Sequence, residues 1–127
     1  MKKLSKDEVL WLHKMLINDT GGSLGLRDEG LLESALNVPF SSFDGVELFP
    51  TLLEKAARLA LGLVNNHPFN DGNKRIGIMA MQIVLHINGI VFCCDNDELV
   101  RLGLSIAKSE LKHEGILQWL HINSKPL

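Results

Sequence analysis

Residues 67–75 read HPFNDGNKR, and they separate two long apolar stretches of the chain. The stretch before them, residues 52–66, carries apolar residues at helical spacing and opens on a capping-box sequence. The stretch after them, residues 76–94, is uncharged, and the turn signal at residues 88–89 ends a helix there. We therefore expect two long helices joined by a short loop, with the second helix starting near Gly72.

The rest of the chain predicts further helices. Helical spacing and capping residues place them at residues 6–18 behind a capping box, at residues 31–38 between the N-cap Asp28 and Pro39, at residues 96–109, and around residues 116–120. Residues 40–50 are expected to form an irregular loop or a small hairpin, and residues 90–93 can pair only locally. The predicted fold is all-α, a compact helical bundle of about six helices, with residues 1–127 forming a single domain.

Composition limits the function classes. The chain has 127 residues and a formal net charge of −2, which gives no electrostatic footprint for direct nucleic-acid binding. The N-terminal lysines precede no apolar run, so no signal peptide is expected. Residues 76–94 are long enough to span a bilayer, but a helix that stops at Gly89 is too short. With only the adjacent Cys93 and Cys94, we expect reduced thiols and a cytoplasmic protein without a membrane partner.

Residues 72–75 put two cations on the first turn of the second helix. The N–H groups of a first turn have no partner within the helix, and the helix dipole is positive there. Lys74 and Arg75 at this end each cost about 0.3 kcal/mol or more, unless another interaction offsets their charge. An anion bound at Gly72, Asn73, Lys74 and Arg75 would remove that cost, and a polyphosphate suits such a site.

Three neighbours of this turn add chemistry. Asp71 can serve as N-cap or hold a Mg²⁺ ion that bridges a phosphate. His67 can take a proton from a hydroxyl near neutral pH. Phe69 is apolar within a polar loop and is expected to anchor the loop in the core. Each residue alone has a plain structural interpretation, as a cap, a solvated charge or a loop histidine. Together they indicate phosphoryl or nucleotidyl transfer.

The same nine residues resemble the signature of the Fic family, H-x-F-x-[DE]-G-N-[GK]-R, and most closely its Doc (death-on-curing) branch. Residues 21–36, GGSLGLRDEGLLESAL, and the segment NGI at residues 88–90 also resemble that branch. The resemblance implies a compact helical bundle and one role for each matching residue: His67 as the base, Asp71 as the metal ligand, Asn73 and Arg75 as phosphate ligands, the backbone around Gly72 as an anion hole, and Phe69 as the anchor of the loop.

Two positions depart from the commoner Fic pattern. That pattern has Gly where this chain has Lys74, and a second Arg where this chain has Ile78. The resemblance to the Doc branch implies a protein kinase that uses ATP and Mg²⁺, moves the γ-phosphate to a threonine of elongation factor Tu and stops translation. Two alternatives remain: AMP transfer to a protein hydroxyl by the same site, and a non-catalytic module that binds a nucleotide or a peptide.

The resemblance also implies regulation by an antitoxin partner, because the Doc branch resembles the toxin half of toxin–antitoxin pairs. Residues 109–115 are similar to an inhibitory motif of AMP-transferring members but have one residue too many, so we interpret them as a helix connection. Residues 40–50 match the place of a flap that aligns target peptides. Their phenylalanines either dock such a segment or anchor the loop.

Two other features have plain interpretations. The glycine-rich residues 20–30 resemble phosphate loops only loosely and lack the GK[ST] ending, so we expect a helix connection rather than a nucleotide contact. His13 and His86 are expected to be hydrogen-bonded residues in or beside the core.

Overall fold

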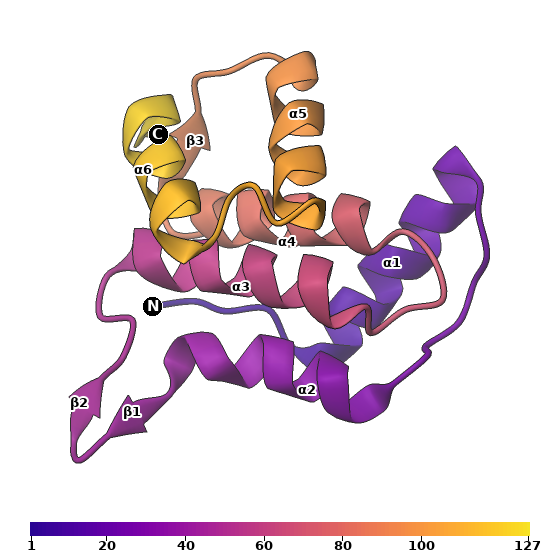
Figure 1. Cartoon of the computed structure of the whole chain (residues 1–127), viewed down its shortest axis with the longest axis horizontal. Helices are drawn as coiled ribbons and strands as arrows, with labels where there is room; N and C mark the ends of the chain where they lie inside the picture. Colours follow the sequence, from indigo (N-terminus) through magenta and orange to yellow (C-terminus); the bar gives the residue numbers. More distant parts are fainter.

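The computed structural model describes residues 1–127 and consists mainly of helices (Figure 1). Its elements in chain order are α1 (Lys6–Thr20), α2 (Glu29–Asn37), the 3₁₀ turn η1 (Val38–Phe40), β1 (Ser42–Phe43), β2 (Val46–Glu47), α3 (Leu52–Asn66), α4 (Asn73–His86), β3 (Ile90–Phe92), α5 (Asn96–Ala107), α6 (His113–Asn123) and β4 (Ser124–Pro126). The expected all-α bundle of about six helices is confirmed. The strands form only two antiparallel pairs, β1 with β2 and β3 with β4.

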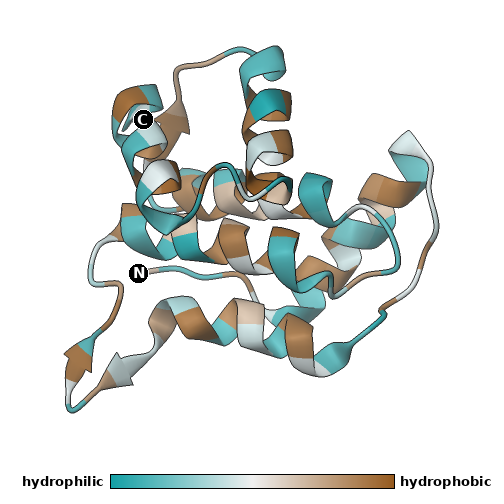
Figure 2. Ribbon diagram, in the orientation of Figure 1, coloured by the Kyte–Doolittle hydropathy of each residue, from teal (hydrophilic) through white to brown (hydrophobic).

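Helix α3 is the centre of the bundle, and more than half of its 15 residues are buried. It packs against α2, α4 and α6, and Figure 1 shows it between α2 and α4. Helices α3 and α4 approach so closely that a Cβ at Gly77 would lie 2.6 Å from Cγ2 of Val64. This contact aligns the end of α3 with the start of α4, which are the two supports of the loop at residues 67–72. Apolar and polar residues alternate around each helix in Figure 2, as amphipathic helices require.

Most helix starts follow the predicted caps. Ser5 and Glu8 form both bonds of a capping box. Thr51 accepts the N–H of Glu54, but the Glu54 carboxylate accepts from the Thr51 hydroxyl instead of the backbone, so only half of the second box forms. Helix α2 ends at Asn37, and the 3₁₀ turn η1 follows it directly. Pro39 fits the start of this turn, because a proline's missing N–H is not needed there.

The apolar stretch at residues 76–94 divides as expected. Helix α4 ends at His86. Residues 90–92 form a strand, but they pair with the distant residues 124–126 and not locally as expected. None of the helices is both long and apolar enough to cross a membrane.

The hairpin formed by β1 and β2 lies at the opposite end of α3 from the loop at residues 67–72 (Figure 1). A helix of 15 residues is about 22 Å long. The hairpin is therefore not next to His67, and the flap position that the resemblance implied for residues 40–50 is not found. Phe40 and Phe49 are loop anchors, because Lys3 lies 4.7 Å from the Phe40 ring centroid and Phe49 packs edge-on against His113. Phe43 is 76% exposed.

Candidate functional site

His67 lies directly after the last residue of α3 and adopts a left-handed backbone conformation, with φ of 50°. A side chain other than glycine needs support in this conformation. Arg27 supplies it: its Nε donates to the His67 carbonyl at 2.6 Å, and its Nη2 donates to the Asn66 carbonyl at 3.0 Å. These bonds satisfy carbonyls that α3 leaves without partners at its end. The His67 side chain is exposed and makes no hydrogen bond within the chain, so its imidazole is free to meet a substrate.

The loop between α1 and α2 runs beside the loop at residues 67–72. The backbone N–H groups of Arg27 and Asp28 both donate to the Pro68 carbonyl, at 2.7 and 3.0 Å. The N–H of Asn70 donates to the Gly25 carbonyl at 3.0 Å. The glycine-rich segment is thus a helix connection, as expected, and it also acts as a brace that holds the loop carrying His67.

Phe69 fastens the same loop to the core. Its side chain is 2% exposed and stacks on His13, with ring centroids 3.7 Å apart. His13 is itself buried, and its Nε2 lies 2.7 Å from the carbonyl oxygen of Asp71. The expectation of a hydrogen-bonded His13 is therefore confirmed, and this residue connects α1 to both ends of the short segment 69–71.

Asn73 closes the loop onto itself. Its Oδ1 accepts the N–H of Phe69 and its Nδ2 donates to the Phe69 carbonyl, both at 3.0 Å. The resemblance assigned Asn73 to phosphate binding, but its amide is already bonded at both ends. We therefore interpret the side chain as a clamp that sets the loop's shape. Its Nδ2 has a second N–H that these bonds do not use, so phosphate binding by Asn73 stays a prediction.

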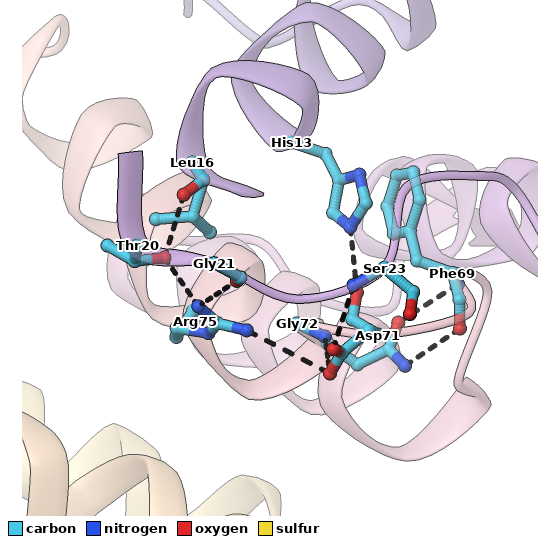
Figure 3. Close-up of polar contacts among 10 residues, drawn as sticks. His13, Leu16, Thr20, Gly21, Ser23, Phe69, Asp71, Gly72 and Arg75 are labelled. Atoms are coloured by element: carbon cyan, nitrogen blue, oxygen red, sulfur yellow. Dashed lines mark hydrogen bonds and ion pairs between the residues drawn. The ribbon is translucent and has the colours of Figure 1, made fainter. Parts of the chain in front are cut away.

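Asp71 carries the carboxylate of the site (Figure 3). Its Oδ2 accepts the N–H of Ser23 at 3.1 Å and its Oδ1 accepts the N–H of Gly72 at 2.8 Å. The bonds from Ser23 and Gly72 lower the pKa of Asp71 below its ordinary value, with a smaller contribution from Arg75. The carboxylate is therefore ionised at neutral pH, as a ligand of Mg²⁺ must be.

The surroundings of Asp71 decide what kind of metal site fits. Asp71 does not belong to any cluster of three or more His, Cys, Asp or Glu side chains that could hold a metal ion. Magnesium commonly binds to one or two carboxylates together with substrate phosphates and water. The half-exposed Asp71 fits that arrangement and does not fit a metal held by the protein alone.

Arg75 reaches from the first turn of α4 to the end of α1. Its Nη1 donates to the Thr20 hydroxyl and, at 3.1 Å, to the Gly21 carbonyl, while its Nη2 lies 3.8 Å from Asp71 Oδ1 (Figure 3). The C-terminal end of α1 is the negative end of its dipole. This contact, together with Asp71, offsets part of the cost of a cation at the start of α4. Lys74 has no such partner and is exposed.

The start of α4 presents unpaired backbone donors. Helix α4 begins at Asn73, and its N-cap Gly72 is left-handed and has no side chain that could accept a capping bond. No acceptor within the chain meets the N–H groups of Asn73, Lys74 and Arg75. Three unpaired N–H groups beside two cations can accept an anion, which is what the expected phosphate role of this turn requires.

The structure brings together all residues singled out in the sequence motif, on one loop and one helical turn. It adds three residues that sequence reasoning missed, because they lie about 50 positions earlier: Thr20, Ser23 and Arg27. Ser23 and Arg27 lie within residues 21–36, whose resemblance to the Doc branch names a segment without assigning it a contact. Thr20 lies just before that segment and has no such signal.

Comparison with known proteins agrees with this geometry. A sequence model described as the Fic/DOC family matches residues 3–85, which is more than half of the chain. The chain belongs to the Fic/DOC family. Its relatives include the protein named Toxin Doc from Mycolicibacterium smegmatis, 44% identical over 77 residues. That match covers 61% of this chain and 59% of the relative, so it spans less than two thirds of that protein.

A second relative spans nearly the whole chain. The protein named Protein kinase doc from Escherichia phage P1 is 29% identical over 121 residues, 94% of each chain. The residues matched by the family model include residues 67–75. Both relatives carry the name Doc.

Proposed function

We propose that this chain is a Doc-type toxin that transfers the γ-phosphate of ATP to a threonine or serine hydroxyl of a target protein. The observation that carries the proposal is the first turn of α4, where Lys74 and Arg75 stand beside unpaired N–H groups. One turn further, Ile78 occupies the position of the second Arg of AMP-transferring members. The name of the phage relative, a protein kinase aligned over 94% of its length, supports the same choice.

The residues divide the reaction between them. His67 takes the proton of the target hydroxyl, whose oxygen attacks the γ-phosphorus. The bond from the γ-phosphorus to the β,γ-bridging oxygen breaks, and ADP leaves with the electron pair. Lys74, Arg75 and the N–H groups of α4 counter the charge that develops on the phosphate oxygens. Arg27, Phe69 and Asn73 hold His67 and the helix start in fixed relation, so that the reacting groups meet in one geometry.

ATP would be the co-substrate and Mg²⁺ the metal. Bound between Asp71 and the phosphates, Mg²⁺ would neutralise phosphate charge and polarise the bond to the leaving group. The ionised, half-exposed carboxylate of Asp71 supports this assignment.

The partners follow from the resemblance to Doc toxins. We propose elongation factor Tu as the target protein, inhibition of translation as the outcome, the cytoplasm as the place of action, and an antitoxin protein as the inhibitor. Within residues 109–115, the first four lie in the connection between α5 and α6, where Ser109 has φ of 60°, and the last three begin α6. No single helix spans the segment. An external inhibitor is consistent with that absence.

Labelled ATP tests the proposal. The purified chain is incubated with Mg²⁺ and a bacterial lysate, once with the label on the γ-phosphate and once on the α-phosphate. We expect a labelled protein only from the γ-label, and no labelled protein with His67→Ala. His121→Ala is the matched control, because His121 is an exposed histidine on α6, outside the loop. Label from the α-phosphate would mean AMP transfer, and label from neither would favour a binding module.

A growth assay gives an independent readout. Expression of the chain without a partner should stop bacterial growth, and His67→Ala should restore it. If both proteins are equally harmless, the toxin assignment is wrong.

A further inference from the structure

We propose that His13 is a positioning residue that locks the peptide group between Asp71 and Gly72 in one orientation and so keeps the start of α4 ready for phosphates. The link to phosphates rests on the proposed function. The Nε2 atom of His13 lies 2.7 Å from the carbonyl oxygen of Asp71 (Figure 3). A carbonyl oxygen can only accept a hydrogen bond, so Nε2 carries the proton and donates it.

His13 interrupts an otherwise apolar buried face of α1. Val9, His13 and Ile17 follow one another at intervals of four residues on that face, and each is at most 3% exposed. A polar side chain in such a place costs free energy unless it is hydrogen-bonded. The bond to Asp71 is the one hydrogen bond that the His13 side chain makes within the chain. An apolar residue would pack α1 at least as well, so the histidine points to a role in the loop that it contacts.

The peptide group that His13 holds is able to turn over. Such a turn would change φ of Gly72, which is 78° in the structure, to a negative value. Glycine adopts φ of either sign at little cost, so its own backbone does not prevent the change. A larger residue does not fit there, because a Cβ at Gly72 would lie 3.0 Å from Cδ1 of Ile17. Contacts around the peptide must therefore select its orientation.

Two contacts, on opposite sides of the peptide, favour the orientation that the structure shows. His13 donates to the Asp71 carbonyl, and the Gly72 N–H donates to Oδ1 of the Asp71 carboxylate at 2.8 Å. The C=O and N–H of a trans peptide point in opposite directions. A peptide that turned over would therefore direct its carbonyl oxygen at the carboxylate, where two acceptors repel each other.

The orientation of this peptide affects both charged groups of the site. The Asp71 carboxylate faces Nη2 of Arg75 at 3.8 Å, so a carbonyl oxygen that displaces the carboxylate also disturbs this ion pair. A cation bound to Asp71 would compete with the Gly72 N–H for the lone pairs of the carboxylate. His13 lies on the other side of the peptide, so its bond would persist when that competition weakens the bond from Gly72.

The donor itself is rigidly placed. The His13 ring stacks on the buried Phe69, with ring centroids 3.7 Å apart and an angle of 9° between the ring planes. Stacking fixes the ring plane, and the ring plane fixes the direction in which Nε2 donates. The structure thus pairs a rigid donor with the peptide whose glycine permits a second orientation.

Nuclear magnetic resonance of the Gly72 amide tests the lock without ATP. His13→Phe keeps a ring against Phe69 but removes the donor. We expect the Gly72 amide signal to move or to split into two, and its hydrogen exchange to accelerate by about tenfold or more. His13→Gln keeps a donor within reach of the Asp71 carbonyl and should restore part of the parent signal. Val9→Ala is the matched control, because it weakens packing one turn earlier on the same buried face of α1.

The parent chain decides the question even if His13→Phe does not fold. We expect a slowly exchanging Nε2 proton of His13, with a scalar coupling across the hydrogen bond from Nε2 to the carbonyl carbon of Asp71. Absence of that coupling would overturn the proposal. A Gly72 signal that moves no further in His13→Phe than in Val9→Ala would also overturn it, because the effect would then be one of packing.

ATP binding tests the consequence for the site. Calorimetry with excess Mg²⁺, on chains that also carry His67→Ala, should show about tenfold weaker ATP binding for His13→Phe. His13→Gln should restore part of the affinity, and Val9→Ala should leave it unchanged. Equal ATP binding by His13→Phe and Val9→Ala would overturn the role of the lock in this site.

The proposed function and the lock can fail separately. A chain in which His13→Phe moves the Gly72 signal, but which binds no ATP and labels no protein, would refute the proposed function and retain the lock. A chain that labels a protein from ATP, but in which His13→Phe leaves the Gly72 signal in place, would do the reverse.

Discussion

The two ends of α3 carry loops of opposite character. At its C-terminal end, the loop at residues 67–72 is bonded to α1, to the α1–α2 connection and to the first turn of α4. At its N-terminal end, every residue of the hairpin from Ser42 to Leu48 is exposed. The buried Lys55 on α3 holds that hairpin by donating hydrogen bonds to the Glu47 carboxylate and the Phe49 carbonyl.

The difference shows where the fold concentrates long-range contacts. Catalytic groups need a geometry held within fractions of an ångström, and the bonds on several sides of the loop at residues 67–72 suit the role proposed for it. The hairpin has few contacts to lose, and local opening there should be easy. One helix therefore supports a rigid loop at one end and an adaptable one at the other.

The largest expected difference in unfolding free energy is between the variants Phe69→Ala and Phe43→Ala. Phe69→Ala removes a buried ring and its stack on His13, and we expect a loss of about 3–5 kcal/mol in the free energy of unfolding. Phe43→Ala, on the hairpin, should change it by less than about 0.5 kcal/mol. Urea denaturation of both variants checks this. Equal losses would mean that the two ends of α3 do not differ as described.

Loss of the Asn73 clamp should cause the next largest fall in unfolding free energy. Asn73→Ala leaves the N–H and carbonyl of Phe69 without their partners, and we expect a loss of about 1–3 kcal/mol in unfolding free energy. Hydrogen exchange of the Phe69 amide should accelerate as well. The exposed Asn65 on α3, which makes no side-chain bond, provides the comparison through Asn65→Ala. An unchanged exchange rate at Phe69 would exclude the clamp.

Loss of Arg27 should mainly change the backbone conformation of His67. Arg27→Met removes two bonds to carbonyls at the end of α3, with a stability loss of about 1 kcal/mol. The backbone coupling constant and Cα shift of His67 should move away from left-handed values, and the growth arrest should weaken. Arg27→Lys should restore part of both effects. Arg101→Met is the control, because Arg101 is an exposed arginine on α5. Unchanged His67 signals in Arg27→Met would show that the guanidinium does not position this residue.

The smallest expected effect concerns pH. The pKa of Asp71 is lowered in the folded chain by the N–H of Ser23 and then of Gly72, so its carboxylate stabilises the fold above the ordinary value of 3.8. That stabilisation is lost as the pH falls through the lowered value. The stability gap between the parent chain and Asp71→Asn should thus stay constant near neutral pH and narrow only as the pH falls below the ordinary value of 3.8. A gap that stays constant below that value as well would contradict this, with Asp44→Asn on the hairpin as control.

The elements of the fold could be predicted from the sequence because their signals are local. Capping at Ser5, Asp28 and Thr51 depends on residues three positions apart, and all three side chains cap their helices. The end of α4 before Gly89 was predicted in the same way. Where the prediction was incomplete, as at Pro39, a tight 3₁₀ turn replaced the expected break.

The loop at residues 40–50 shows that a segment's position along the chain does not predict its position in the fold. Its predicted small hairpin is present, yet the full length of α3 separates it from His67. The direction in which a helix carries the chain depends on how it packs, and a linear motif does not state that.

The sequence by itself determined which chemical groups stand in the candidate site, since residues 67–75 lie on one loop and one helical turn whatever surrounds them. Only the tertiary structure decided how those groups are held and what lies beside them. Arg27 meets the carbonyl of His67, Ser23 meets the carboxylate of Asp71, and α5 closes a cavity against Ile78. These contacts join residues about 25 to 50 positions apart, and they exist because burial of apolar faces sets the helices at one mutual distance and angle.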